Sequence, residues 1–194
     1  MSEKFKFDES LKDDEKKFGF SSKGETFKIA EGDNKFRVLT KGICLASHFQ
    51  GKGQKSPICY GQDKGCQYHG YFDPANPQAG EHQKANLKWA MYVIDRKDNK
   101  IKLAFMPHTV IKAVAEYQKS EDYSFDGLPM PYDITLKAKG AGTKEVEYTL
   151  MPSPKQSELT EQEASDLEAK MPIDQLVEKL KNKQMSADSS NDDE

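Results

Sequence analysis

The chain has 194 residues and a formal net charge of −3, with 36% hydrophobic and 31% charged residues. This length suits one domain with a hydrophobic core, and the low hydrophobic content indicates that part of the chain lies outside that core. The sequence has no apolar run long enough for a membrane span, and its charged start, MSEKFKFDESLKDDEKK, is unlike a signal peptide, so we expect a cytoplasmic protein.

The charges are unevenly distributed along the chain. Residues 1–27 carry a net charge of −1, residues 28–151 a net charge of +4 and residues 152–194 a net charge of −6. A basic middle region beside an acidic end predicts affinity for a polyanion, which the overall pI of about 5.9 conceals.

The first strands are predicted after an N-terminal extension, residues 1–27. In KFRVLTKGICL, Phe36 and Val38 alternate with charged side chains, which is typical of a strand. The turn EGDN separates this strand from a short one at Phe27–Ala30. An insert rich in glycine, cysteine and histidine follows at residues 44–72.

Two hairpins and one helix are predicted after the insert. Residues 87–94 and 100–106 flank a tight turn, and a second hairpin turns at Gly140-Ala141-Gly142. Between them, HTVIKAVAEYQKS has helical spacing, with Thr109 as its expected N-cap. Strands in this order favour a mainly β chain with a single OB fold, a five-stranded Greek-key barrel with one internal helix, over residues 28–155.

A helical segment is predicted at residues 156–185. Thr160 and Glu163 have the spacing of a capping box, and IDQLVEKLKNK is a second amphipathic stretch beyond Pro172. Residues 186–194 contain no apolar residue after Ala187, so we expect a disordered acidic tail. This tail is either a solubility element or a nucleic-acid mimic that competes for a basic groove and docks other proteins.

Cysteine and histidine in the insert predict a metal site. The candidate ligands His48, Cys59, Cys66 and His69 have the spacing H-x10-C-x6-C-x2-H. Zinc prefers four nitrogen or sulfur ligands in a tetrahedron, and so polar a loop has little else to hold it folded. We therefore expect a structural Zn²⁺. Two alternatives stay open: Cys44 replaces His48, or the thiols are simply buried beside surface histidines.

Aromatic and basic residues are interleaved in the same part of the chain. Single-stranded nucleic acid needs this mixture, because cations follow the phosphates while flat rings stack on unpaired bases. For Trp89 and Tyr92, the two aromatic residues of LKWAMYVI, the alternative is burial in the core. The candidate DNA-binding residues are Lys35, Arg37, Lys41, Phe49, Lys52, Lys55, Tyr60, Tyr68, Tyr71, Phe72, Lys88, Trp89 and Tyr92. The sequence lacks the common catalytic motifs, so we do not expect an enzyme.

Four segments carry a resemblance to a known family. EGDNKFRVLTKG, CYGQDKGCQYHG, LKWAMYVIDRKDNKIKLAFMPHTVIKAV and YDITLKAKGAGTKEVEYTLMPSP resemble the single-stranded DNA-binding proteins of tailed bacteriophages. The order of His48, Cys59 and Cys66 is similar to that in the zinc-bearing helix-destabilising protein of T-even phages, where a cysteine stands at the position of His69.

The resemblance implies an OB fold and sequence-independent binding of single-stranded DNA in replication, recombination and repair. It also implies that the acidic C-terminus recruits replication or recombination proteins, and that the compartment is the host cytoplasm. Self-association through the N-terminal phenylalanines or the helical segment is a further expectation. The competing interpretations are an RNA-binding OB module and a zinc-stabilised adaptor that binds only proteins.

Overall fold

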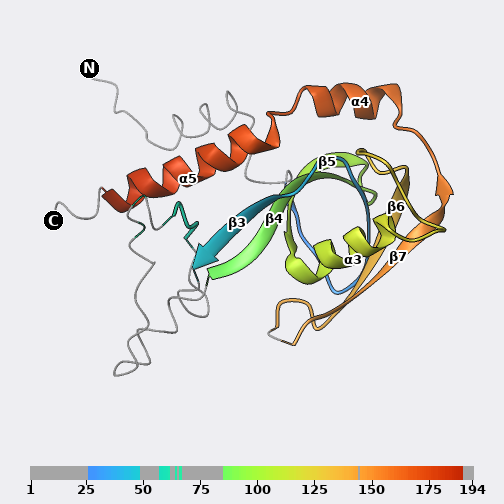
Figure 1. Cartoon of the computed structure of the whole chain (residues 1–194), viewed down its shortest axis with the longest axis horizontal. Coiled ribbons are helices and arrows are strands. Elements are labelled where there is room, and N and C mark those ends of the chain that lie inside the picture. Colours follow the sequence, from blue (N-terminus) through green and yellow to red (C-terminus); the bar gives the residue numbers. More distant parts are fainter. Residues whose placement is uncertain are drawn as a thin grey trace, which may run out of the picture.

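A computed structural model of the chain describes residues 26–48, 57–61, 64, 66, 85–143 and 145–189. The predicted mainly β architecture with C-terminal helices is confirmed (Figure 1). The elements are β1 (Thr26–Phe27), β2 (Gly32–Val38), β3 (Ile43–His48), β4 (Ala85–Asp95), β5 (Lys100–Pro107), α3 (His108–Gln118), β6 (Tyr132–Lys139), β7 (Glu147–Gln156), α4 (Glu161–Glu168) and α5 (Ile173–Ser189).

Both predicted hairpins are present. In the first, the whole of β5 pairs with residues 88–95 of β4, so that Trp89 lies opposite Met106. Asn99 closes the turn with φ 53°, a left-handed conformation that asparagine tolerates better than most residues. The Lys102 ammonium bonds the carboxylates of Asp95 and Asp98, each at 2.7 Å, which fixes the register at the turn. The second hairpin joins β6 to β7 through Gly140 and Gly142, both with positive φ.

The strands β2 and β3 behave as one long strand with a kink. The first half of β2 pairs with β6, and its end pairs with β4. Residues 39–42 then oppose only two residues of β4, and β3 continues along the rest of that strand. Gly42 allows a close approach at the kink: an added Cβ would lie 3.1 Å from the Trp89 Cβ and would have to displace the Met91 Cε, which lies 2.7 Å from its position.

The sheet is open. Its strand order is β1-β5-β4-β2-β6-β7, with β3 paired to β4, and only the short β1 runs parallel to its neighbour. The strands curve around an interior that α3 crosses (Figure 1). The closed barrel expected from the sequence is therefore not confirmed, because β5 and β7 do not pair with each other within the described residues.

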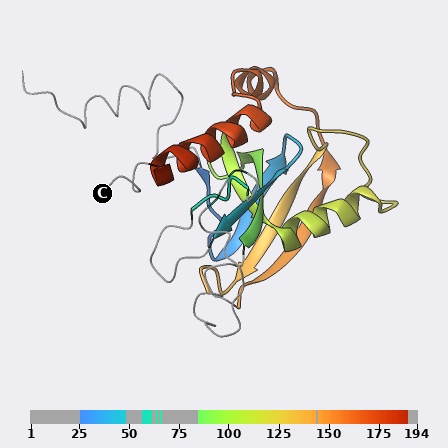
Figure 2. The same cartoon turned by 60° about the vertical axis from the view of Figure 1, so that its left-hand side comes forward.

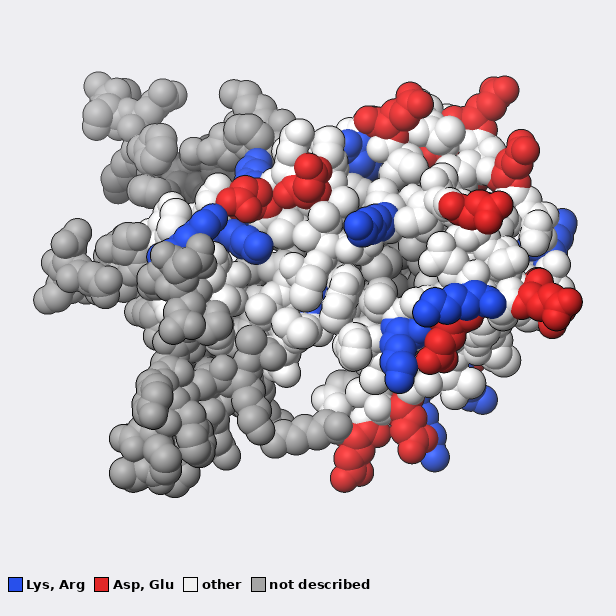
Figure 3. Space-filling model, viewed as in Figure 1, with Lys and Arg blue, Asp and Glu red and all other residues white. Residues whose placement is uncertain are grey.

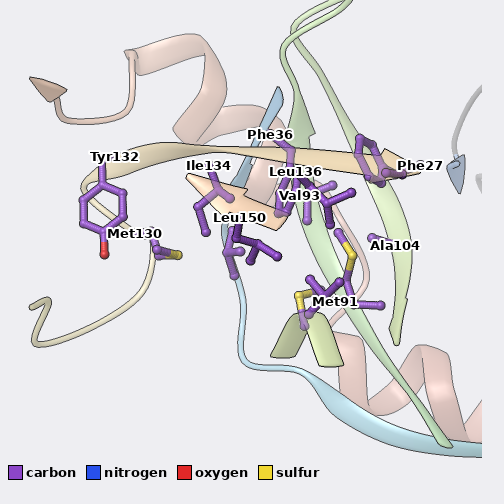
Figure 4. Close-up of a cluster of buried hydrophobic side chains, with 14 residues drawn as sticks. Phe27, Phe36, Met91, Val93, Ala104, Met130, Tyr132, Ile134, Leu136 and Leu150 are labelled. Carbon is purple, nitrogen blue, oxygen red and sulfur yellow. The ribbon is translucent and has the colours of Figure 1, made fainter. Parts of the chain in front are cut away.

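The main core fills the concave side of the sheet. Alternate residues of the long strands point inward, as the period of two requires, and Phe36, Ile134 and Leu136 are fully buried (Figure 4). Val110 of α3 is buried against them, with Ala113, Val114 and Tyr117 partly buried beside it. The expected helical stripe is confirmed, whereas Thr109 is not the N-cap: β5 runs straight into α3, and Pro107 takes that position.

The C-terminal helices cover the opposite side of the sheet from α3 (Figure 2). Thr160 and Glu163 form the predicted capping box at the start of α4. In α5, Leu176 and Val177 are buried against β3, β4 and β5. This helix continues to Ser189, so the first four residues of the expected disordered tail are helical, and residues 190–194 lie outside the described part.

None of the helices within the described residues combines the length and the apolar character that a bilayer crossing requires.

Candidate functional site

Backbone pairing brings the metal-ligand candidates together. Within the insert the chain returns beside β3, where Ser47 and Ile58 form an isolated antiparallel bridge. The His48 amide donates to the Pro57 carbonyl at 2.9 Å, and the Cys59 amide donates to the Ala46 carbonyl at 2.8 Å. Cys59 therefore projects from the same face of the sheet as His48, its diagonal neighbour.

Three of the four predicted ligands form one cluster. The ligand atoms of His48, Cys59 and Cys66 all lie within 4.8 Å of one another, and the Cys66 Sγ is 3.7 Å from the His48 Nε2. Zinc–sulfur and zinc–nitrogen bonds of about 2.3 and 2.05 Å at the tetrahedral angle place sulfur and nitrogen about 3.6 Å apart. The observed separation fits a shared tetrahedral ion, so this group can hold a metal.

The cluster is buried. His48 is fully buried, Cys59 is 7% exposed and Cys66 is 4% exposed, and Ala46 and Met185 pack around the thiols. Burial raises the pKa of the Cys59 thiol; a hydrogen bond at Gly61 opposes this rise and the neighbouring Cys66 adds to it. Burial thus favours the neutral Cys59 thiol, and a bound cation would have to displace its proton.

The remaining ligand candidates have different outcomes. His69 lies outside the described residues. Cys44 is exposed and does not belong to the three-residue cluster, so the structure favours His48 over Cys44 as the ligand from β3. Cys44 instead lines a neighbouring cavity together with Lys64 and Lys181.

An aromatic surface lies on β4, close to the metal cluster. The Trp89 indole stacks on the His108 imidazole, with ring centroids 5.3 Å apart and planes inclined by 27°. Trp89 packs partly against the main core, whereas His108 is exposed. Leu87, two residues before Trp89 and on the same face, is 51% exposed. These three residues, two from β4 and His108 from the start of α3, are called the β4 platform; they offer two stacked rings and an exposed aliphatic side chain.

His108 is the platform residue that sequence reasoning missed. The hairpin register contains the signal, because it places Met106 opposite Trp89, and His108 follows two residues later. The direct passage from β5 into α3, which the sequence did not indicate, then brings the imidazole onto the indole.

Among the described residues, the predicted DNA-binding candidates do not share one surface. Lys35, Lys41 and Lys88 are exposed, and Trp89 is partly exposed. Tyr60 is 7% exposed within the metal cluster's shell. Six further candidates lie outside the described residues: Phe49, Lys52, Lys55, Tyr68, Tyr71 and Phe72.

Tyr92 and Arg37 are corrections to the sequence-based interpretation. Tyr92 is three residues from Trp89, an odd offset that puts it on the opposite face of the strand. There it is 6% exposed, packs beside Leu176 and donates a hydrogen bond to the Met171 carbonyl at 3.0 Å. Lys88 also lies on the face opposite Trp89, for the same reason.

Arg37 is 3% exposed and belongs to an internal ion-pair network. Its Nε donates to Asp133 Oδ1 at 2.9 Å, and its Nη1 and Nη2 donate to the carbonyl and hydroxyl oxygens of Ser157. Arg96 donates to the same Asp133 oxygen and to Glu163. An arginine with these internal partners is not available to a DNA phosphate.

Charges on the surface are mixed. In Figure 3, Lys and Arg side chains gather over the C-terminal half of α5, whereas positive and negative groups alternate over the β6–β7 side. A continuous basic stripe is not visible on this face. Comparisons of the chain with protein-family models, curated proteins and solved structures gave no match.

Proposed function

We propose that this protein binds single-stranded DNA without reading its sequence, and so coats and protects strands exposed in replication, recombination and repair. The carrying observation is the Trp89–His108 stack beside the exposed Leu87. Unpaired bases stack on such rings whatever their identity, and each stacked base contributes about 1–3 kcal/mol.

The strand order supports an OB-type assignment for this domain. Counting the kinked β2–β3 as one strand, the order β5-β4-β2-β6-β7 corresponds to 3-2-1-4-5 in chain order. A five-stranded Greek-key barrel has this order when it is opened between its third and fifth strands, and α3 lies between the third and fourth strands. OB domains commonly bind oligonucleotides across the face of their second and third strands, here β4 and β5.

The sequence resemblance to bacteriophage single-stranded DNA-binding proteins points in the same direction. It also supports a structural zinc ion on His48, Cys59 and Cys66, with His69 as the proposed fourth ligand. Such an ion would fix the segment around Cys59 against β3, beside the platform. In this proposal the acidic end recruits replication or recombination proteins.

Fluorescence tests the proposal directly, because Trp89 is the only tryptophan. Poly(dT) is expected to quench its emission and to shift the protein in a gel, and high salt should reverse both effects. Matched RNA and duplex DNA oligomers serve as competitors. Absence of a gel shift at low salt would refute the proposal; stronger competition by RNA than by DNA would assign the platform to RNA instead.

The platform itself is tested by Trp89→Ala with a labelled oligonucleotide. Loss of one stacked base predicts about 5- to 150-fold weaker binding, whereas Met151→Ala, which removes a 47% exposed side chain from β7, should leave binding unchanged. Equal affinities for the wild type and Trp89→Ala would show that bases are bound elsewhere. Far-UV circular dichroism confirms that the variants are folded.

A further inference from the structure

A cavity of about 380 Å³ lies next to the metal cluster. Three parts of the chain form its wall: β3 contributes Cys44, residues 59–64 of the insert contribute Cys59, Tyr60 and Lys64, and α5 contributes Lys181. The volume lies within the usual range of ligand sites, at its lower end. The cavity shares Cys59 with the metal cluster and Tyr60 with the predicted DNA-binding residues, whereas Lys64 and Lys181 belong to neither set.

The cavity is electropositive. Lys64 and Lys181 both line it, and none of the described lining residues carries a carboxylate. Glu178 is an acidic neighbour in the described part of the chain, and its Oε1 lies 3.3 Å from the Lys64 Nζ in an exposed ion pair. An exposed pair of this kind contributes little to stability and is readily exchanged for another anion. Two ammonium groups against one displaceable carboxylate favour an anionic ligand.

The cavity also adjoins the β4 platform. Cys44 is the cross-strand partner of Trp89, so their side chains project from the same face of neighbouring strands. Adjacent strands are about 4.8 Å apart. A nucleotide whose base covers Trp89 can therefore place its phosphodiester at the lysine-lined cavity.

We infer that this cavity receives a backbone phosphate of the strand whose base stacks on Trp89, with Lys181 and Lys64 as its cationic contacts. The inference rests on the proposed function and extends it. The sequence placed residues 156–185 outside the DNA-binding region, whereas here α5 supplies part of the binding surface through Lys181.

The salt dependence of binding tests the inference. Affinity of the zinc-loaded, full-length protein for a fluorescent oligo(dT) is measured by anisotropy at several NaCl concentrations. Lys181→Gln should weaken binding roughly three- to tenfold at low salt and flatten the slope of log K against log[NaCl] by about 0.7, the value for one phosphate contact on a single strand. Lys181→Arg should restore the slope.

Two matched variants separate a direct contact from general charge or structural effects. Lys183→Gln removes an equal charge from an exposed site on the same helix and should leave the slope unchanged. Glu178→Gln frees Lys64 and should strengthen binding, an effect opposite in sign to that of damage to the fold. Lys64→Gln should resemble Lys181→Gln.

The outcomes are decisive. If the wild type binds and Lys181→Gln keeps its slope, or if Lys183→Gln loses as much, the inference fails and the proposed function survives. If the wild type does not bind, both fail. Replacing NaCl with sodium phosphate at equal ionic strength adds a competitor: a loss of DNA affinity larger in the wild type than in Lys181→Gln would show that free phosphate and the DNA diester compete for Lys181, which supports the inference.

Discussion

Asp133 links three parts of the molecule through one carboxylate. It lies on β6 and accepts hydrogen bonds from Arg37 of β2 and from Arg96 of the turn after β4, and Lys35 lies 3.6 Å away. Burial alone would raise the pKa of the Asp133 carboxyl, but the hydrogen bonds and charge of Arg96, and then those of Arg37, outweigh it, so this pKa lies below its usual value.

Asp133→Asn should therefore be strongly destabilising. The amide cannot neutralise Arg37, which is 3% exposed, and breaking a buried pair typically costs about 3–5 kcal/mol. Urea unfolding at pH 7 measures the free energy of unfolding. Asp126→Asn, at an exposed carboxylate, is the control and should change it by less than about 0.5 kcal/mol. Similar values for the two variants would contradict a structural role for Asp133.

The difference in stability between the wild type and Asp133→Asn should depend on pH. Because the folded-state pKa of Asp133 is lowered, its contribution is complete above the unfolded-state pKa of about 3.9 and is lost as pH falls through the folded-state value. The stability difference between wild type and Asp133→Asn should therefore be constant from pH 7 to about pH 5 and shrink below about pH 4. A difference that grows on acidification would contradict this sign.

Among the elements, α5 is the one whose role differs most from its sequence-based interpretation. Its amphipathic pattern predicted a helix, but not which surface the helix would cover. Leu176 packs into the cluster that contains Leu39, Tyr92 and Ile101, so α5 buries the outer face of β4 and β5. This packing explains why Tyr92 is a buried core residue and does not line a DNA-binding groove.

Leu176→Ala should destabilise the protein by about 2–5 kcal/mol, because the removed side chain is 5% exposed and leaves a cavity between helix and sheet. Thermal or urea unfolding measures the loss. Leu87→Ala removes the same atoms from a side chain that is 51% exposed, so it should cost much less. Equal losses would mean that α5 does not pack on the sheet as described.

For the whole molecule, the metal cluster joins the insert, the sheet and α5. Met185 of α5 packs against Cys59 and Cys66, so loss of the ion should loosen the C-terminal half of the helix as well as the insert. Protein purified without added metal is expected to contain one zinc per chain by elemental analysis, and a strong chelator should lower its melting temperature.

Cysteine variants identify the ligands. Cys59→Ser should lose the zinc, whereas Cys44→Ser, at an exposed thiol outside the cluster, should retain it. A zinc-free wild type with unchanged melting in chelator would exclude the structural ion. Loss of zinc in Cys44→Ser together with its retention in His48→Ala would restore Cys44 as the ligand in place of His48.

The acidic end belongs to the same scale, because we propose that its charge competes with DNA for residues 28–151, whose net charge is +4. Deleting residues 190–194 should strengthen DNA binding at low salt, and the gain should disappear as salt screens the charges over a few ångströms. A chain of unchanged length in which Asp192, Asp193 and Glu194 become amides should behave like the deletion. If only the deletion has an effect, chain length and not charge is responsible.

Local patterns in the sequence determined the elements. Alternation identified the two hairpins, and helical spacing with a capping box identified α3, α4 and the start of α5, because these signals come from residues close together in the chain. The cysteines and the histidine of the metal cluster could also be predicted from the sequence, because the residue type alone determines whether a side chain can donate sulfur or nitrogen to a metal.

Tertiary structure alone decided which side chains share a surface. Arg37 and Tyr92 are residue types that are common in DNA-binding grooves. Here, however, Asp133 of β6 and Ser157 bind the Arg37 side chain, and α5 packs over Tyr92; all of these partners are distant in the chain. Tertiary structure also brought two residues to the candidate site that the sequence did not indicate. The direct passage from β5 into α3 places His108 on Trp89, and the packing of α5 on the sheet places Lys181 at the cavity. The exposure of a residue depends on which distant segments pack over it, and the local sequence pattern contains no information about those segments.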